Sequence, residues 1–187
     1  MILWWVASDY MAIGAAVHER HAASAELSAA EVAAVAGRVR SGEAGSHEAY
    51  AFLRNPLCPP DLLAQNAESR DVYARTSVAS NASLDPALAA KLAGDADEQV
   101  RLYLAFNRTP PDILARLAAD GSEDVRKVVV WTATLPDESF NRLVNDPSPE
   151  VRVAAVAQPR LTAAQVEKLK NDPNEDVREA AIGRWGE

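Results

Sequence analysis

Hydrophobic and polar positions recur along this chain with a period of about 26 residues. A Val-Arg dipeptide, or Ala-Arg in the earliest copy, places arginines at Arg75, Arg101, Arg126, Arg152 and Arg178, which are 26, 25, 26 and 26 residues apart. A leucine precedes the valine by eight residues, and an aspartate precedes the valine by five. These residues are Leu92, Leu117, Leu143 and Leu169, and Asp95, Asp120, Asp146 and Asp172. Regular self-similarity at such a period is typical of an array of stacked repeats.

Each copy contains the start signals of two helices. Three residues before the valine or alanine stands a side chain that can accept hydrogen bonds from the free N–H groups of a helix start. These residues are Asp71, Asp97, Ser122, Ser148 and Asn174. Capping boxes or prolines in the first turn indicate the start of the other helix. The capping boxes are Ser28 with Glu31 and Thr162 with Gln165, and the proline signals are Asp85-Pro86, Pro59-Pro60, Pro110-Pro111 and Pro136.

The second helix of each copy carries one apolar stripe. The valine and the residues four and five positions after it are apolar, which is helical spacing and predicts burial. The stripes are Val100/Leu104/Ala105, Val125/Val129/Val130, Val151/Ala155/Val156 and Val177/Ala181/Ile182. One unit of this length cannot bury its stripe alone, so we expect stacked units with a continuous core. The sequence therefore predicts an all-α solenoid of about six two-helix repeats.

The repeat resembles a known family. Its motif is L-x-x-D-x-x-x-x-V-R, followed by small apolar residues and a turn, as in LVNDPSPEVRVAAVAQP from Leu143 to Pro159. This motif resembles the leucine-rich repeat variant family and, more loosely, HEAT repeats, clearly over residues 55–184 and weakly over residues 27–54. The resemblance implies a right-handed, HEAT- or armadillo-like superhelix of paired helices without strands. The founding type of that family also has a Cys-rich iron–sulfur module, from which this chain departs because Cys58 is its one cysteine.

The domain organisation follows from the repeat. We expect an N-terminal helical cap at residues 1–26, a divergent first repeat at residues 27–54, and five regular repeats at residues 55–187, all in one solenoid domain. The first 17 residues are apolar, but Asp9 interrupts them and the first basic residue is Arg20. This pattern fits neither a spanning helix nor a signal peptide, so no membrane role is expected.

Composition and charge reduce the number of function classes that fit this chain. Alanine, the best helix former, supplies 37 of the 187 positions, which agrees with an all-helical fold. A lone cysteine cannot form an intramolecular disulfide, and we expect a reducing, cytoplasmic location. The net charge of −8 disfavours a nucleic-acid partner. His18, His21 and His47 are the three histidines and lie outside the regular units. His18 and His21 offer too few ligands for a metal, and no catalytic motif occurs, so neither an enzyme nor a cofactor is expected.

The repeated arginines have a structural and a functional interpretation. A ladder of Arg75, Arg101, Arg126, Arg152 and Arg178 could bind phosphates. Each arginine also accompanies an aspartate near the end of the preceding helix. We therefore favour charge-assisted hydrogen bonds that join helix ends within and between repeats.

The positions at which the repeats differ are the best indication of a contact surface. Three and six residues after the valine the later repeats have small residues, whereas the middle repeats have Tyr103 and Phe106, then Val128 and Trp131. A patch of aromatic residues suits protein recognition, and packing in the core explains their size equally well. The N-terminal Trp4 and Trp5 pose a similar choice between an end cap and a homodimer contact.

The sequence as a whole favours a non-catalytic scaffold or adaptor that binds another protein. A HEAT-like module for nucleic acid and an accessory domain that assists an enzyme are the alternatives.

Overall fold

The structure is a computed structural model that describes residues 27–107 and 109–186. The expected N-terminal cap, with Trp4, Trp5, His18 and His21, lies outside the described residues. Within the described part the chain is all-helical and has no strand. It divides into two compact units, whose described portions are residues 27–113 (the N-terminal unit) and 114–186 (the C-terminal unit). None of the described helices is long and apolar enough to cross a membrane.

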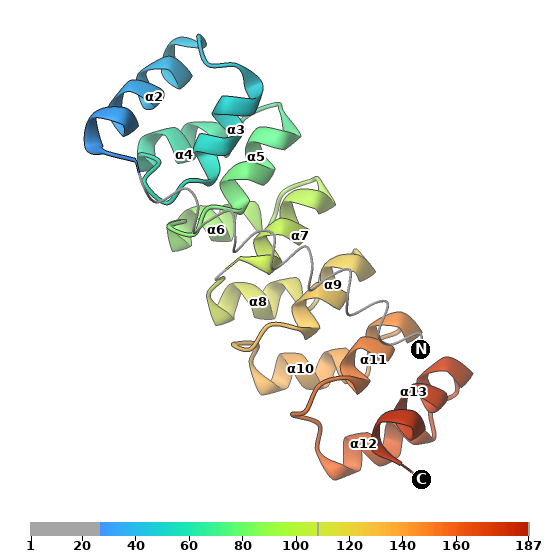
Figure 1. Cartoon of the computed structure of the whole chain (residues 1–187). Coiled ribbons are helices and arrows are strands. Elements are labelled where there is room, and N and C mark those ends of the chain that lie inside the picture. Colours follow the sequence, from blue (N-terminus) through green and yellow to red (C-terminus); the bar gives the residue numbers. More distant parts are fainter. Residues whose placement is uncertain (1–26, 108, 187) are drawn as a thin grey trace. The chain divides into compact units, whose positions relative to one another are not determined.

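The N-terminal unit contains short helices that pack in the order of the sequence. They are α2 (Ala29–Ser41), α3 (Ser46–Arg54), α4 (Pro60–Asn66), α5 (Val72–Ala79), α6 (Pro86–Leu92), α7 (Glu98–Phe106) and the start of α8 (Pro111–Leu117). In Figure 1, α3, α5 and α7 lie side by side in one layer, and α4 and α6 lie in a second layer. We refer to α3, α5 and α7 as second helices because each is the second member of its pair.

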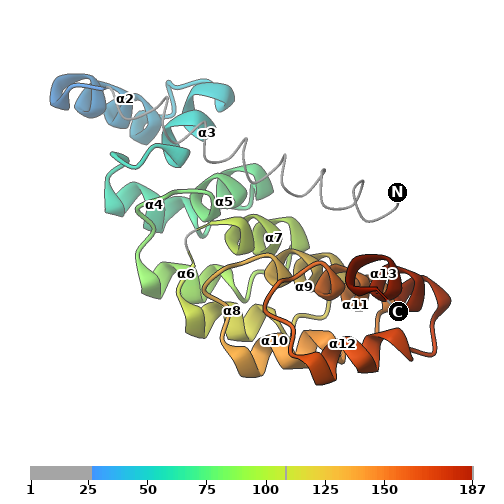
Figure 2. The same ribbon diagram turned by 60° about the horizontal axis from the view of Figure 1, so that its bottom comes forward.

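The C-terminal unit repeats this arrangement. After the end of α8 it contains α9 (Glu123–Val130), α10 (Asp137–Val144), α11 (Pro149–Val156), α12 (Ala163–Lys170) and α13 (Glu175–Trp185). The second helices α9, α11 and α13 pack on one another in sequence order, and α10 and α12 cover one side of them (Figure 2). The described residues thus show a helical repeat in which neighbours in the sequence are neighbours in space.

The helices begin where the capping residues predict. Asp71, Asp97 and Asn174 are N-caps whose side chains accept hydrogen bonds from the first turn, and both capping boxes are formed. Ser122 and Ser148 are also N-caps, but their side chains make no capping bond. In those two copies the aspartate two residues earlier accepts from the serine N–H, at 2.8 Å for Asp120 and 2.9 Å for Asp146. The same bond forms in copies whose caps do bond, from Asp97 N–H to Asp95 and from Asn174 N–H to Asp172, so the aspartate orders the turn in all four copies. The Ser148 hydroxyl donates to the Glu150 carboxylate instead of capping the helix.

The apolar stripe forms the core, with one exception. Val100, Val125, Val151 and Val177 are all 0% exposed, and the leucine of each copy is also buried. Ile182, predicted to be buried, is instead 41% exposed. The prediction is wrong there because α13 packs on α11 and α12, and no described helix covers its opposite face.

Arginine–aspartate pairs join consecutive repeats. The guanidinium of Arg126 binds the carboxylate of Asp146 through two nitrogens, with Nε–Oδ2 at 2.7 Å and Nη2–Oδ1 at 2.9 Å. Arg152 binds Asp172 in the same way, and Arg75 binds Asp95. In each pair the aspartate lies 20 residues after the arginine, in the next repeat. The third nitrogen, Nη1, donates to a main-chain carbonyl of the arginine's own repeat, such as Asp120 O at 2.8 Å for Arg126.

Asparagines make a second ladder in the N-terminal unit. The Nδ2 atom of Asn81 donates to Leu53 O and Asn55 O, both at 2.8 Å. Asn107 repeats this 26 residues later, and donates to Ala79 O at 2.9 Å and Asn81 O at 2.7 Å. Each amide therefore binds two carbonyls at the C-terminal end of the preceding second helix, where main-chain carbonyls lack the intrahelical partner. Asn55 O and Asn81 O also accept the main-chain N–H groups of Cys58 and Leu84.

The pKa values of Asp95 and Asp172 lie below the ordinary value for aspartate. Burial of each carboxylate is the largest influence and opposes ionisation. The arginine of the preceding repeat and the main-chain N–H two residues further on donate hydrogen bonds to the ionised form, and together these outweigh burial. The folded state therefore favours the charged carboxylates.

The first prediction concerns the buried pairs. Asp146→Asn leaves the guanidinium of Arg126 without its counter-charge at a site where the two side chains are 3% and 12% exposed. We expect the free energy of unfolding to fall by about 3 kcal/mol, measured by urea denaturation. Asp61→Asn is the matched control, because the Arg40–Asp61 pair is exposed, and it should cost under about 1 kcal/mol. Equal losses in the two variants would contradict the structural role of the ladder.

The second prediction concerns pH. Because the folded-state pKa values of Asp95 and Asp172 are lowered, their contribution to stability is complete above the unfolded value of about 3.9 and is lost as the pH falls through the folded values. The urea midpoint should therefore be lower at pH 2.5 than at pH 6. In Asp172→Asn the drop between these two pH values should be smaller, since one of the titrating groups is gone. An unchanged drop would mean that Asp172 does not carry this dependence.

Candidate interaction surface

The residues predicted to form an aromatic patch differ in burial. Tyr103 and Phe106 lie on α7 in the N-terminal unit and are half-buried. Trp131, the C-cap residue of α9 in the C-terminal unit, is also half-buried. Val128 is 1% exposed and packs in the core, so its assignment to a contact surface is corrected. The reason is that Val128 lies on the side of α9 that packs within the unit, next to the buried Val129.

The indole Nε1 of Trp131 is a buried donor without a hydrogen-bond partner. This atom is inaccessible to solvent and has no hydrogen-bond acceptor, and the same holds for Nε2 of Gln158. By contrast, the indole Nε1 of Trp185 donates to Val156 O at 3.0 Å. An unsatisfied buried donor costs free energy. The C-terminal ends of α9 and α11 thus each hold one buried donor without an acceptor among the described residues.

A tyrosine pair that the sequence analysis did not identify is the most exposed aromatic feature of the described residues. Tyr73 on α5 is 70% exposed, and its ring lies 6.1 Å from that of Tyr50 on α3, tilted by 33°. The Tyr50 hydroxyl donates to the carboxylate of Asp71, the N-cap of α5. This hydrogen bond raises the pKa of Tyr50, since it stabilises the protonated phenol. Asp71 therefore holds one ring in place while the other projects into solvent.

A signal for Tyr73 exists in the sequence. The residue just before the valine of the motif is polar in the other copies, namely Gln99, Asp124, Glu150 and Asp176, and Tyr73 takes that place in the earliest copy. A single exposed apolar residue is common on protein surfaces and needs no special explanation. A tyrosine at a position that is otherwise solvated and polar is more informative, because it fills no space in the core.

The arginine ladder is largely occupied by aspartate. Arg75, Arg126 and Arg152 each direct two nitrogens to a carboxylate, and their side chains are 12–15% exposed. Arg101 and Arg178 donate through Nη1 to main-chain carbonyls, as the other three do. Guanidinium groups used in this way are poorly placed to bind phosphates.

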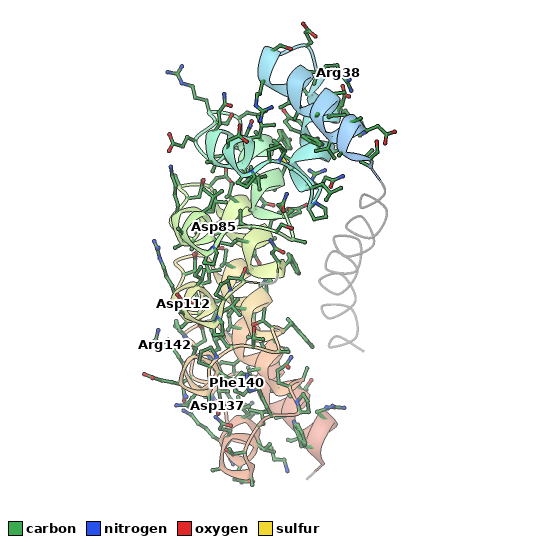
Figure 3. All side chains as sticks on the ribbon, turned by 90° about the vertical axis from the view of Figure 1, so that its left-hand side faces the viewer. Arg38, Asp85, Asp112, Asp137, Phe140 and Arg142 are labelled. Atoms are coloured by element: carbon green, nitrogen blue, oxygen red, sulfur yellow. The ribbon has the colours of Figure 1, made fainter. Side chains whose placement is uncertain are left out.

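The first helix of each pair carries charged side chains on its exposed side. On α10 these side chains form no catalytic or ligand-binding cluster. Figure 3 shows Asp137, Phe140 and Arg142 on α10, where Phe140 is 3% exposed and the other two face solvent. Arg160 lies over the Phe140 ring at 4.6 Å and also binds Asp137. These contacts join the loop before α12 to α10.

The described residues show no group of three or more His, Cys, Asp and Glu side chains that could hold a metal ion. Cys58 is 4% exposed, and burial, followed by the nearby Asp61 carboxylate, raises its pKa to about 12. Its thiol is therefore protonated and unreactive at neutral pH. A hollow of about 700 Å³ between the N-terminal ends of α4 and α6 is lined mainly by apolar residues such as Leu63, Leu84 and Leu88.

Asp85, which also lines this hollow, is already used by the chain. One oxygen of its carboxylate accepts hydrogen bonds from the N–H groups of Ala87 and Leu88. The hollow therefore offers shape and apolar surface, but no arrangement of acid, base or nucleophile.

Comparisons with family models, curated proteins and solved structures found no match for this chain. Membership of the leucine-rich repeat variant family therefore stays a prediction from the repeat motif.

The third prediction separates core from surface. Val128→Ala should lower the free energy of unfolding by about 1–3 kcal/mol, since it removes buried methyl groups and leaves a cavity. Tyr73→Ala should change it by less than about 0.5 kcal/mol, since most of that side chain is in solvent. Urea denaturation of both variants would measure this contrast. A large loss in Tyr73→Ala would show that the tyrosine pair serves the fold.

Proposed function

We propose that this protein is a non-catalytic scaffold or adaptor that binds another protein through the second-helix layer. The observation that carries the proposal is the exposed Tyr73, supported against Tyr50 and unused by the core. Tyrosine combines a large rigid ring with a hydroxyl, and it is enriched among the residues that dominate protein–protein binding. The half-buried Tyr103 and Phe106 on α7 extend the aromatic character of this layer within the N-terminal unit.

The finer architecture is part of the same proposal. The 26-residue recurrence of helix pairs supports a right-handed α-solenoid of about six repeats, of the leucine-rich repeat variant or HEAT type. In such a fold the residues that repeat hold the stack together, and those that deviate are free to recognise a partner. A single buried cysteine suits a reducing compartment such as the cytoplasm.

Charge separates this proposal from a nucleic-acid-binding module. The chain has 27 acidic and 19 basic residues, and three ladder arginines are paired with aspartates. A polyanion would meet a net repulsive field and few available guanidinium groups. A protein partner with apolar and basic residues fits better. Dimerisation through Trp4 and Trp5 is a separate proposal that concerns residues outside the described part.

The fourth prediction tests the contact surface. Tagged wild-type protein and its Tyr73→Ala variant would each be used for affinity capture from an extract of the source cells, followed by quantitative mass spectrometry. We expect a partner protein that is recovered by the wild type and reduced at least tenfold in the variant, at moderate salt. Glu98→Ala, which changes an exposed side chain at the N-terminal end of α7, is the matched control and should retain the partner. Recovery of nucleic acid that is lost steeply as salt rises would contradict the proposal.

A further inference from the structure

Each second helix uses one face for the preceding second helix and another face for the next one. Tyr73 on α5 contacts Tyr50 on α3, with ring centroids 6.1 Å apart. In the C-terminal unit the pKa of Glu150 on α11 is lowered chiefly by a hydrogen bond from Ser148 and also by the nearby charge of Lys127 on α9. In both pairs the later residue follows the earlier one by 23 positions. Neighbouring second helices therefore meet in one constant register in both units.

The face that other second helices pack against the next one is uncovered on α13. Ile182 has the place in the repeat that Leu53 has on α3 and Val156 has on α11. Leu53 lies three residues after Tyr50, on the side that meets α5. Leu53 and Val156 are both 0% exposed, whereas Ile182 is 41% exposed. Glu179, three residues before Ile182, is exposed on the same face. An apolar and an acidic side chain thus stand where another second helix would pack.

Arg178 carries the polar part of the same contact. Its Nη1 donates to Asp172 O at 2.7 Å and to Pro173 O at 2.9 Å. Arg152 makes the two equivalent bonds, and its other nitrogens bind the carboxylate of Asp172, 20 residues later in the next repeat. The guanidinium of Arg178 is thus held in the orientation that binds a carboxylate, and no carboxylate of the described residues pairs with it.

The opposite face is open on α3. Ala51 has the place in the repeat that Ser77 has on α5 and Ala154 has on α11. Ser77 lies four residues after Tyr73, so this place belongs to the face that meets the preceding second helix. Ser77 and Ala154 are 0% and 2% exposed, whereas Ala51 is exposed. His47, four residues before Ala51, is exposed on the same face.

The loop before α3 contains a carboxylate in the register that the arginine requires. Glu43 directly follows the C-cap residue of α2, just as Asp172 directly follows the C-cap residue of α12. Glu43 also precedes Asn55 of the asparagine ladder by 12 residues. Asp95 precedes Asn107 by the same number. Glu43 is exposed, and its side chain is one methylene longer than that of aspartate, so its carboxylate can extend from the turn toward a neighbouring molecule.

We propose that copies of this chain stack head to tail, with α3 of one copy packed on the open face of α13 of another copy. Glu43 of the one copy pairs with Arg178 of the other, as aspartate and arginine pair between consecutive repeats inside the chain. The exposed Ile182 and Ala51 supply the apolar part of the contact. The stacked copies thus continue the contacts that each unit already makes between its own repeats.

The contact agrees in register and polarity at a second point. His47 has the place of Tyr73 on α5. Glu179 has the place of Tyr50 on α3, so the imidazole and the carboxylate lie side by side in the stacked copies. An imidazole N–H donates a hydrogen bond to a carboxylate. A contact between two copies of α13 would bring no carboxylate from a preceding loop to Arg178.

The two faces are different surfaces, so the contact is heterologous and each copy keeps one open face after it binds. Assembly therefore continues beyond a dimer as the protein concentration rises. A second copy carries both the loop carboxylate and the uncovered second helix in the required register, and this favours it over an unrelated helix as the occupant.

The fifth prediction is tested by charge reversal on the full chain. In sedimentation equilibrium the mass of the wild type should rise beyond twice the monomer mass across micromolar concentrations. Arg178→Glu or Glu43→Arg brings like charges together, so each variant alone should be a monomer. An equimolar mixture of the two variants should assemble again, because every contact between unlike copies pairs opposite charges. Glu138→Arg, which reverses an exposed charge on α10, is the matched control and should assemble as the wild type does.

Ile182→Asp keeps the outcome decisive if a variant at Arg178 folds poorly. Because Ile182 is already exposed, this variant should keep its melting temperature within about 2 °C and should be a monomer. A wild type that stays monomeric up to millimolar concentration would overturn the proposal. Assembly that persists in Glu43→Arg or in Ile182→Asp, or a mixture of the two folded charge variants that stays monomeric, would overturn it as well.

Discussion

The repeat depends on the hydrogen bonds by which one arginine joins a loop of its own repeat to a loop of the next repeat. Arg126 donates to a carbonyl of its own repeat with Nη1 and to the carboxylate of Asp146 with Nε and Nη2. The helices are 7 to 13 residues long, and helices of this length are marginal in isolation. Their order must therefore come from tertiary contacts, and a planar, bidentate group fixes both the distance and the angle between successive loops.

The aspartate in each pair has a second task. Oδ1 of Asp146 accepts hydrogen bonds from the Ser148 N–H and from Arg126. Oδ1 of Asp172 likewise accepts a hydrogen bond from the Asn174 N–H. The carboxylate thus orders the turn that begins the next second helix while it holds the previous repeat. This explains why the motif has an aspartate at that position, where a glutamate would be too long to reach both partners.

The sequence predicted the fold well because its signals are local and repeated. Caps, early prolines and the valine stripe each concern residues within a few positions of one another, and they recur in several copies. The sequence analysis erred at Ile182 and left Val128 open between surface and core. Both cases arise because burial depends on which neighbour covers a helix face, and this is a property of the assembled repeat. Spacing alone also paired arginine with aspartate without showing that the carboxylate belongs to the next repeat.

The candidate contact surface was harder to predict for the same reason. Tyr73 deviates from the polar residues at its position, but its exposure and its support by Tyr50 follow from the packing of α3 on α5. The asparagine ladder was visible as a recurrence of Asn55, Asn81 and Asn107 every 26 residues, yet its role becomes clear only when the amides reach the preceding helix end.

The two units differ in the side chains that lie against the C-terminal ends of their second helices. In the N-terminal unit Asn81 and Asn107 satisfy the preceding carbonyls and are consumed by the fold. In the C-terminal unit Gln158 takes the corresponding place, six residues after the arginine, and its Nε2 finds no acceptor. The longer side chain has more rotamers to lose and misses the carbonyls that the asparagine reaches. Where the regular contact fails, the amide stays buried without an acceptor, which costs free energy.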